Sequence, residues 1–384
     1  MSRSNAFSIL LTALASACTG PVLAGDYPPV TCDARAAYAG RPLRAAVDID
    51  VPTPAIPDSP LDPGTARRLD DAFTLTQGAA RAPTMTAAVA IPGKGEWQRN
   101  AAPAGTPPVW FWASVGKTMT AVVVLQLAEE GKLSLDDKVS RWIRDVPNGD
   151  VATVRDLLAH TSGLFSANED LPARADPRYR PPSETLTIAR RHGAMFCPGA
   201  NWRYSNTGYD LLGEIIARLD GRPFEQSIAA RIIQPLALRS MRALVPGSDA
   251  DGVAPLQSAR ERPIDPSWTG AAGAIVADAA DMARFWAALM EGRLVPRKTV
   301  EAMFGTLYPM FDPGTFYGLG VMAFDVPDKD RQLLWLGHAG GTPGASAVLA
   351  YSPADNAIVA VALTGDGPAV AVANQLLKAV RAAP

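Results

Sequence analysis

The sequence predicts an α+β fold, in which both ends of the chain form an antiparallel sheet flanked by helices and a mostly helical segment is inserted between them. Two observations support this prediction. Strand-like runs occur near the start of the chain and again at its end, whereas the middle is apolar at helical spacing. The 384 residues are enough to bury a large core, and no internal repeat is visible.

The strands are predicted at the two ends of the chain. An amphipathic helix over residues 66–77 precedes a hairpin of residues 84–91 and 96–99, which a turn of glycine, proline and lysine joins. Near the C-terminus, three apolar runs precede a last helix. These elements are residues 332–338, 346–351, 358–363 and 369–381.

The middle of the chain is predicted to be mainly helical. Helices are expected over residues 114–130, 206–219 and 278–292. Thr153 and Asp156 have the spacing of a capping box that opens a further helix. We therefore predict one domain over residues 66–384, with a helical insertion over about residues 118–265.

Composition and charge exclude several classes of partner. The 36 basic and 38 acidic residues give a net charge of −2, so no basic excess indicates nucleic acid or an anionic membrane. Three cysteines and three histidines, without a C-x-x-C or H-E-x-x-H motif, give little support for a metal site. We predict no metal and no nucleic-acid partner.

Residues 1–24 have the pattern of a cleaved secretory signal. Arg3 provides a positive start, an apolar run over residues 6–18 follows, and small residues precede a cleavage site after Ala24. The run is shorter than the roughly 20 residues that span a bilayer, and no other segment approaches that length. We predict a secreted or periplasmic protein without a transmembrane span in its mature form, with lipid attachment at Cys18 as an alternative.

Residues 25–65 form a proline-rich extension ahead of the main domain. The prolines of residues 51–63 disfavour helix and central strand, which predicts an extended arm or linker. Export permits disulfides, and cleavage after Ala24 leaves Cys32 and Cys197. Two alternatives stay open, a bridge between them or two unrelated thiols, because a sequence carries no Cα distance.

Ser114 and Lys117 form an S-x-x-K motif at the start of an apolar predicted helix. Residues three apart lie on the same helix face, so the Lys amine can reach the Ser hydroxyl. Burial favours the neutral amine, which can take the Ser proton, and the helix N-terminus favours an oxyanion. The alternative is a Ser cap and a surface Lys, but the apolar flanking residues argue against a surface position.

Tyr204 and Asn206 form a Y-x-N motif, and residues two apart in an extended loop point the same way. In that arrangement Tyr204 can relay a proton near Lys117, and Asn206 can hold both Lys117 and a substrate carbonyl. The alternative is a buried tyrosine beside an asparagine that caps a helix.

His338, Ala339 and Gly340 form an H-x-G motif at the end of an apolar strand, and Gly341 follows. Glycines there let a substrate backbone lie against the strand edge. One strand N–H, together with that of Ser114, can form an oxyanion hole. The alternatives are a structural histidine and a glycine turn.

Several residues near the motifs have a structural interpretation. His160 is predicted to be structural, at the end of a helix before a glycine turn. Trp110, Trp112 and Trp202 flank the motifs and are either core residues or walls of an apolar pocket, and Tyr317 is a candidate for the same lining.

The three motifs, about 90 and 130 residues apart in this order, resemble those of the penicillin-recognising serine hydrolases, which include serine β-lactamases and penicillin-binding proteins. The Y-x-N and H-x-G forms are similar to the branch of class C β-lactamases, D-alanyl-D-alanine carboxypeptidases, D-aminopeptidases and related carboxylesterases. The resemblance covers about residues 66–384. It implies a β-lactamase/transpeptidase-like fold and no cofactor.

The resemblance also implies roles for single residues. Ser114 is similar to the family nucleophile, and Lys117 and Tyr204 are similar to the groups that share its proton. Asn206 resembles the substrate-amide contact. His338 and Gly340 occupy the third motif, and the N–H groups of Ser114 and Gly341 resemble the oxyanion hole.

Two departures from the family pattern bear on the substrate. Ala339 stands where relatives have a threonine that helps to hold a substrate carboxylate, and His338 stands where many have lysine. Losing a hydrogen bond to a charged group costs about 1.5–3 kcal/mol. We therefore predict an exported serine hydrolase that acts through an acyl-enzyme on small esters or on amide and peptide substrates, as a carboxypeptidase or esterase does. The alternatives are a β-lactamase and a penicillin-binding or sensing module with little turnover.

Overall fold

The computed structural model describes residues 29–47, 49, 56–248, 250–328 and 331–381. The predicted signal sequence, the alternative lipid site at Cys18 and residues 51–55 of the proline-rich stretch lie outside the described residues. No helix in the described part of the chain combines the length and the apolar character needed to cross a membrane.

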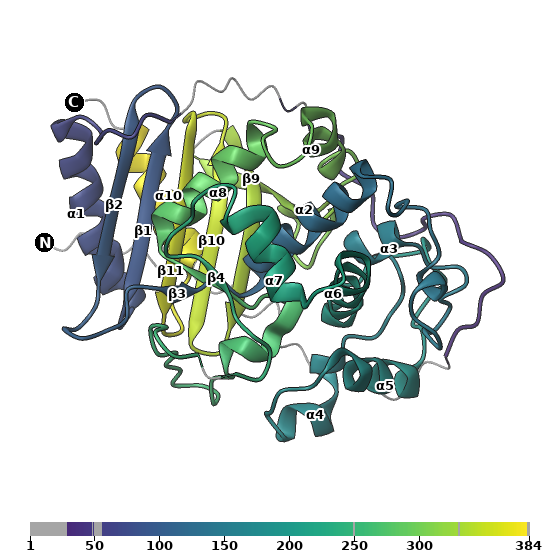
Figure 1. Ribbon diagram of the computed structural model, residues 1–384. Helices are drawn as coiled ribbons and strands as arrows, with labels where there is room; N and C mark the ends of the chain where they lie inside the picture. The colour runs from purple at the N-terminus through teal and green to yellow at the C-terminus, as the bar shows by residue number, and fades with distance from the viewer. Residues whose placement is uncertain (1–28, 48, 50–55, 249, 329–330, 382–384) are drawn as a thin grey trace, which may run out of the picture.

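Eight strands of the described chain form one antiparallel sheet, in the order β2-β1-β11-β10-β9-β8-β7-β6 (Figure 1). The strands are β1 (Met85–Ile91), β2 (Gly95–Ala101), β6 (Tyr308–Pro309), β7 (Thr315–Tyr317), β8 (Met322–Asp328), β9 (Arg331–Thr342), β10 (Ala345–Ser352) and β11 (Ala357–Thr364). The N-terminal β1 pairs with the C-terminal β11, from Met85 opposite Leu363 to Ala90 opposite Ile358. This pairing confirms that both ends of the chain build one sheet.

The sequence predicts five of these strands and misses β6, β7 and β8. β6 and β7 contain two and three residues, and a period-2 pattern needs about four residues to be recognised. β8 contains Pro327, which weakens a strand prediction. These strands form because they continue the sheet beyond β9, which is a tertiary effect.

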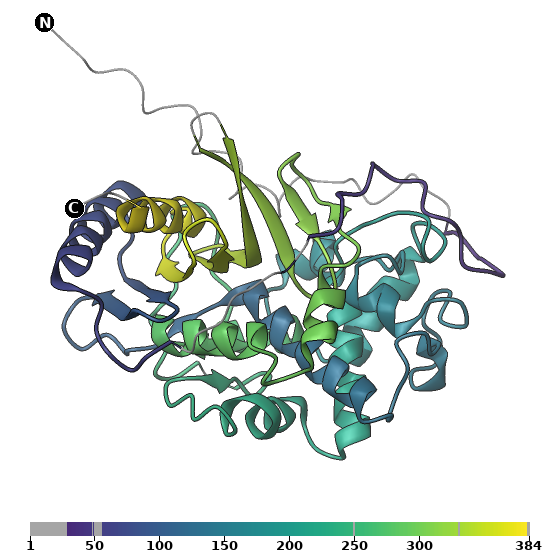
Figure 2. The same cartoon turned by 90° about the horizontal axis from the view of Figure 1, so that it is seen from above.

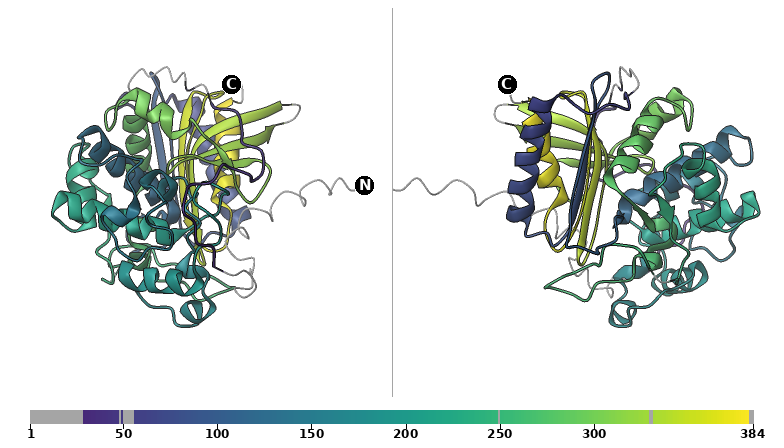
Figure 3. Two further views of the ribbon diagram at one scale, coloured as in Figure 1. Left: turned by 90° about the vertical axis from the view of Figure 1, so that its right-hand side faces the viewer. Right: turned by 60° about the vertical axis from the view of Figure 1, so that its left-hand side comes forward.

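Helices cover both faces of the sheet (Figures 2 and 3). α1 (Pro63–Ala80) and α10 (Ala369–Arg381) pack together on one face, and α8 (Ala279–Met290) and α2 (Gly116–Glu129) lie on the other. Because both faces are covered, every residue of β1 and β11 is buried. α1 begins before the predicted residue 66, since the carboxylate of Asp62 caps it.

A second sheet of three short strands closes the helical segment. β3 (Trp110–Phe111) pairs with β5 (Ile275–Ala277), which also pairs with β4 (Arg242–Ala243). The predicted insertion of about residues 118–265 falls between β3 and β5. Besides α2, the helices there are α3 (Val154–Leu158), α4 (Leu171–Ala175), α5 (Pro182–His192), α6 (Asn206–Asp220) and α7 (Phe224–Ile228), and α9 (Arg297–Met303) follows later in the chain.

The N-terminal extension lies against the loop between α5 and α6. A disulfide joins Cys32 to Cys197, which are 165 positions apart in sequence and have Cα atoms 5.7 Å apart. The N–H of Ala36 donates to the same loop at 2.9 Å. Arg35 forms an ion pair with Asp156, the residue that closes the predicted capping box of α3. The bridge that the sequence left open is therefore confirmed, and the extension is fixed to the helical segment.

Candidate active site

Ser114 lies in a single 3₁₀ turn, residues Ala113–Val115, between β3 and the first turn of α2. Ala113 has a φ of 47°, a left-handed conformation that costs a non-glycine residue of order 1–3 kcal/mol. The surrounding core holds this turn, because Trp112 is fully buried and its indole N–H donates to Ala277 O at 3.1 Å. The fold thereby presents Ser114 at the N-terminus of a buried helix.

Lys117 confirms the expected geometry of the S-x-x-K motif. Its side chain is fully buried, and Nζ donates to Ser114 Oγ at 3.2 Å and to Ala272 O at 2.7 Å. Nζ also lies 4.8 Å from the centroid of the Tyr204 ring and 5.4 Å from that of Tyr209. The amine is therefore held between the serine hydroxyl, one backbone carbonyl and two aromatic rings, and the surface-lysine alternative is wrong.

The Y-x-N motif ends at the start of α6, and the structure decides between its two interpretations. Ser205, not Asn206, caps the helix, with its hydroxyl accepting from Gly208 N–H at 3.3 Å. The side chain of Asn206 is thus available for other contacts, and its amide donates to Asn168 Oδ1 at 2.9 Å. The helix-cap alternative for Asn206 is wrong, and Tyr204 lies over Lys117 as expected.

His338 is placed differently from the expected substrate contact. Its imidazole has no exposed surface, and Nδ1 lies 2.6 Å from Ala339 O, so that nitrogen carries the proton. Nε2 then accepts from the Tyr317 hydroxyl at 3.2 Å, and that hydroxyl lies 3.2 Å from the hydroxyl of Tyr209. Burial and the nearby charge of Lys117 lower the pKa of His338 to about 3. The ring is therefore neutral and packed behind the site, where it supports Tyr317 instead of facing a ligand.

The two glycines of the third motif have different surroundings. A Cβ on Gly340 would lie 2.7 Å from Ser114 N, so only glycine lets β9 approach the serine this closely. β8 pairs with β9 only as far as Gly337, and no other described strand pairs with that edge of β9 beyond this residue. Ala339 N–H points to this edge, since it donates to a sulfur of β8 at 3.5 Å.

Strand alternation places a second amide at the same edge. Backbone N–H groups two residues apart leave a strand on the same side, so Gly341 N–H points as Ala339 N–H does. Ser114 N lies against neighbouring Gly340. Ser114 N thus lies close to the end of β9 that carries Gly341, and the oxyanion hole formed by these two amides stays a prediction.

A family model described as Beta-lactamase matches residues 69–382. The chain belongs to the beta-lactamase family. This beta-lactamase-fold family of serine hydrolases includes penicillin-binding, esterase and amidase relatives, as the motif resemblance implies.

Two named relatives show the range of the family. The chain is 34% identical to penicillin-binding protein 4* of Bacillus subtilis (strain 168) over 148 residues, or 36% of this chain and 32% of that protein. It is 33% identical to esterase EstB of Burkholderia gladioli over 143 residues, or 33% of this chain and 36% of that protein. The chain spans only 32% to 56% of the length of the first curated relatives it matches.

Solved structures match over more of the chain. A D-stereospecific amidohydrolase from Streptomyces sp. has a TM-score of 0.69 and 28% identity, covering 82% of this chain and 98% of that one. The D-amino acid amidase from Ochrobactrum anthropi SV3 has a TM-score of 0.71 with the same coverage, and at 24% identity it shows the fold alone. These matches confirm the predicted α+β, β-lactamase/transpeptidase-like fold.

Some groups at the site of this beta-lactamase-family chain had no signal in the sequence. Ala272 contributes only its carbonyl oxygen, which any residue carries, so nothing in the sequence indicates that it binds Lys117. Asn168 is far from the three motifs in sequence and reaches Asn206 through the fold. The expected pocket role of Tyr317 is wrong, since its side chain is fully buried and bonded to its neighbours.

His160 has the structural role that the sequence predicts. It is buried with a φ of 61°, and its Nδ1 accepts from Ser205 N–H at 3.1 Å, which fixes the residue that caps α6. Its ring centroid lies 4.2 Å from that of Tyr204. Burial and the charge of Lys117 hold the pKa of His160 well below its ordinary value, so the ring is a neutral support for the Y-x-N motif.

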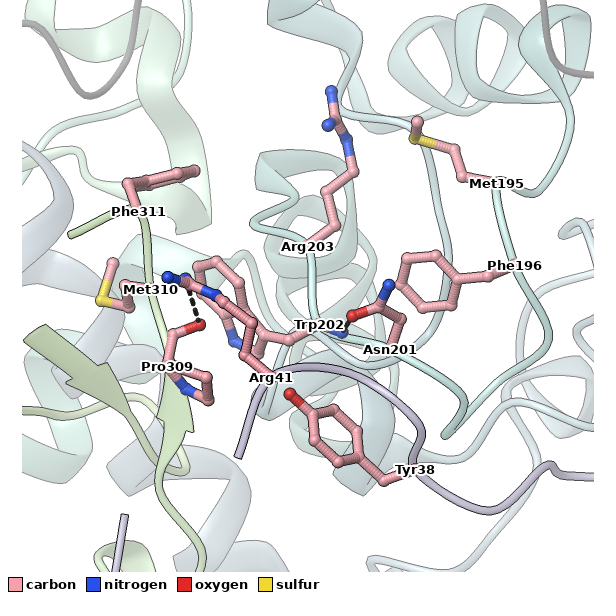
Figure 4. Close-up of a pocket in the computed structure, with 10 residues that line it drawn as sticks. All are labelled: Tyr38, Arg41, Met195, Phe196, Asn201, Trp202, Arg203, Pro309, Met310 and Phe311. Carbon is pink, nitrogen blue, oxygen red and sulfur yellow. Dashed lines mark hydrogen bonds between the residues drawn. The ribbon is translucent and has the colours of Figure 1, made fainter. Parts of the chain in front are cut away.

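A pocket of about 350 Å³ lies between the N-terminal extension, the loop before α6 and the segment that follows β6 (Figure 4). The rings of Trp202 and Phe311 line it, and the centroid of each lies 6.5 Å from that of Tyr204. Trp202 is thus a pocket wall, whereas Trp110 and Trp112 are core residues. The full lining is Tyr38, Arg41, Met195, Phe196, Asn201, Trp202, Arg203, Pro309, Met310 and Phe311.

Proposed function

We propose that this chain is an exported serine hydrolase that cleaves small esters or the amide bonds of D-amino acid derivatives through an acyl-enzyme on Ser114. The observation that carries the proposal is the 3.2 Å contact between Lys117 Nζ and Ser114 Oγ inside a buried site. A buried amine beside a hydroxyl is the arrangement that activates a serine nucleophile.

The acylation step uses groups that the site brings together. Ser114 Oγ attacks the substrate carbonyl carbon, and its proton passes to the Lys117 and Tyr204 pair. The carbonyl oxygen becomes an oxyanion that accepts from the N–H groups of Ser114 and Gly341. The same pair returns the proton to the departing alcohol or amine as the bond to the carbonyl carbon breaks.

Deacylation repeats the same proton transfers with water. A water molecule attacks the ester carbonyl on Ser114 and gives its proton to the Lys117 and Tyr204 pair. The bond to Oγ then breaks, and Ser114 recovers its proton. All of these steps use protein groups, so the mechanism requires no cofactor.

The third motif favours esters and amides over β-lactams. Ala339 supplies no hydroxyl for a substrate carboxylate, and the neutral, buried His338 supplies no positive charge. Similarity to a D-stereospecific amidohydrolase over 98% of that chain supports D-amino acid amides as substrates.

Export is supported by the disulfide. Bridges between protein cysteines persist in oxidising compartments and are rare in the cytosol. The bridge between Cys32 and Cys197 therefore agrees with a signal sequence that is cleaved after Ala24. The N-terminal sequence of the mature protein from a producing host tests this part of the proposal, and a mature chain beginning at residue 1 in the cytosol would contradict it.

Replacing the nucleophile tests the proposed reaction. Ser114→Ala should lower turnover of 4-nitrophenyl acetate and of D-phenylalanine amide by at least about a thousandfold. The control is Ser183→Ala, which changes an exposed serine of α5 and should keep full activity. Intact mass after incubation with benzylpenicillin separates the alternatives. A stable Ser114 adduct without turnover would favour a penicillin-binding module, and rapid hydrolysis of nitrocefin would favour a β-lactamase.

A further inference from the structure

We propose that the pocket beside Tyr204 binds the leaving group of the substrate and selects leaving groups that combine an aromatic or apolar body with a carboxylate, which Arg41 of the N-terminal extension binds. The inference rests on the proposed function, because it assumes that a substrate is cleaved at Ser114. It assigns a substrate-binding role to a segment that precedes the family match at residue 69.

Three segments distant in sequence build this pocket (Figure 4). Tyr38 and Arg41 come from the extension, Trp202 comes from the loop between α5 and α6, and Phe311 follows β6. The extension is held here on both sides of Tyr38 and Arg41. The Cys32 disulfide and a 2.8 Å bond from Ala39 N–H to Ala200 O join it to the loop, and Arg44 N–H donates to Leu307 O at 3.1 Å just before β6.

The position of the pocket relative to Ser114 favours binding of the leaving group over binding of the acyl group. Lys117 Nζ lies 3.2 Å from Ser114 Oγ and 4.8 Å from the centroid of the Tyr204 ring, and the ring centroids of Trp202 and Phe311 each lie 6.5 Å from that of Tyr204. The pair that returns a proton to the departing atom stands next to that atom. A leaving group on the Tyr204 side therefore extends into the pocket.

The apolar part of the pocket is aromatic and accessible. Trp202 and Phe311 are in edge contact at 5.5 Å between ring centroids, and Phe311 is 51% exposed although it is a large apolar side chain. The ring of Phe196 lies across the pocket from Phe311 (Figure 4). Such walls bind an aromatic or apolar group by removing its surface from water.

The charge of the pocket is positive. Of the ten described residues that line it, none is acidic. Arg203 is neutralised by Glu169, whereas Arg41 enters no ion pair among the described residues. The guanidinium of Arg41 donates to Pro309 O at 3.2 Å, which holds it at the pocket and leaves its other N–H groups for an anion. A planar guanidinium binds a carboxylate in a bidentate manner, through two parallel N–H groups.

The test compares two esters that differ in one carboxylate. 4-Nitrophenyl acetate and 3-carboxy-4-nitrophenyl acetate have the same acyl group, and the second carries its charge on the leaving group. Arg41→Gln should lower kcat/KM for the carboxylated ester about ten- to hundredfold and leave the plain ester within about twofold. The matched control Arg67→Gln removes the same charge from an exposed position on α1, which packs on the other face of the sheet, and should change neither value.

A binding measurement separates failure of this inference from failure of the proposed function. Ser114→Ala protein is titrated with 3-phenylpropionate and with 3-phenylpropanamide by calorimetry, with and without Arg41→Gln. We expect the acid to bind more tightly than the amide, and Arg41→Gln to remove the difference. Binding with this pattern but no ester or amide turnover in the wild type would overturn the proposed function alone. Ester turnover with equal effects of Arg41→Gln on both esters, or acid and amide bound equally, would overturn the leaving-group pocket.

Discussion

The reaction centre at Ser114 and the proposed leaving-group pocket are built in different ways. Ser114 lies in the turn between β3 and α2, Lys117 lies in the first turn of α2, and their neighbours are core residues. Tyr38 and Arg41 lie on a segment without helix or strand, which a disulfide and a few backbone hydrogen bonds hold. The difference teaches that the groups that break bonds need a rigid core that excludes water, whereas a pocket wall that selects substrates can be held by a few attachments to that core.

Turnover should be more sensitive to mutation at the buried reaction centre than at the pocket, and Lys117→Ala should have the largest effect. Lys117→Ala removes one member of the Lys117 and Tyr204 pair that takes the serine proton, and general-base contributions are typically 10²- to 10⁴-fold. We expect kcat for 4-nitrophenyl acetate to fall by about a thousandfold. Lys94→Ala, at an exposed hairpin turn, is the control and should be unaffected. Equal activity of the two variants would remove Lys117 from the mechanism.

Gly340 and Gly341 offer a comparison within one strand. A Cβ on Gly340 would lie 2.7 Å from both Ser114 N and Trp112 O, whereas on Gly341 the nearest atom would be Ala345 O at 3.7 Å. Gly340→Ala should therefore displace the serine turn and lower kcat/KM about a hundredfold. Gly341→Ala keeps its backbone N–H and should remain within a few-fold of wild type. Similar losses in both variants would show that the close approach of β9 to Ser114 is not what matters.

Removing the disulfide tests how the N-terminal extension, which carries Tyr38 and Arg41, is attached to the domain. The double variant Cys32→Ser and Cys197→Ser should lower the free energy of unfolding by about 2–5 kcal/mol. The variant should keep the turnover of 4-nitrophenyl acetate, and its ratio of kcat/KM for the carboxylated ester to kcat/KM for the plain ester should fall about tenfold. Urea unfolding and the two-ester assay measure these effects. Loss of both activities with the fold intact would show that the bridge supports the reaction centre as well.

The buried histidine gives a smaller, pH-dependent effect. The pKa of His338 is lowered to about 3 in the folded protein, so between that value and its ordinary pKa of 6.5 the unfolded chain binds more protons. The stability from this group is present above pH 6.5 and is lost as the pH falls towards 3, at about 1.4 kcal/mol per pH unit. Urea unfolding at pH 7 and pH 5 should show a shallower fall for His338→Asn than for wild type.

Asp210 should change the pH dependence of stability in the opposite direction to His338. Burial raises the pKa of its carboxyl to about 7, so the folded protein binds the extra proton between pH 3.8 and 7. The stabilisation of the folded protein by this proton is therefore present at low pH and is lost as the pH rises through about 7. Asp210→Asn should steepen the fall in stability on acidification, whereas His338→Asn should reduce it. A change of the same sign in both variants would contradict these protonation states.

Much of the reaction centre was predictable because its signals are local. Ser114 and Lys117 are three residues apart on one helix, so helix geometry alone brings their side chains together. Tyr204 and Asn206 are two apart in an extended turn, which gives them a common direction. The element pattern likewise predicted β1 and the C-terminal strands, since each is long enough to show its period.

The groups that were not predictable depend on contacts across the fold. The Ala272 carbonyl that binds Lys117 and the Asn168 side chain that binds Asn206 carry no local pattern. Sequence spacing also could not show that His338 turns its ring towards Tyr317 instead of a ligand. Its direction follows from burial between β9 and the aromatic side chains around Lys117.

The sequence by itself determined the nucleophile motif, most of the main strands and helices, and the near balance of acidic and basic residues, because each follows from composition or from residues close together in the chain. Only the tertiary structure decided that Cys32 reaches Cys197 across 165 residues and that Arg41 lines a pocket beside Tyr204. The physical reason is distance along the chain. Two segments far apart in sequence come into contact only when the sheet and helices between them have packed, and local sequence patterns do not predict such contacts.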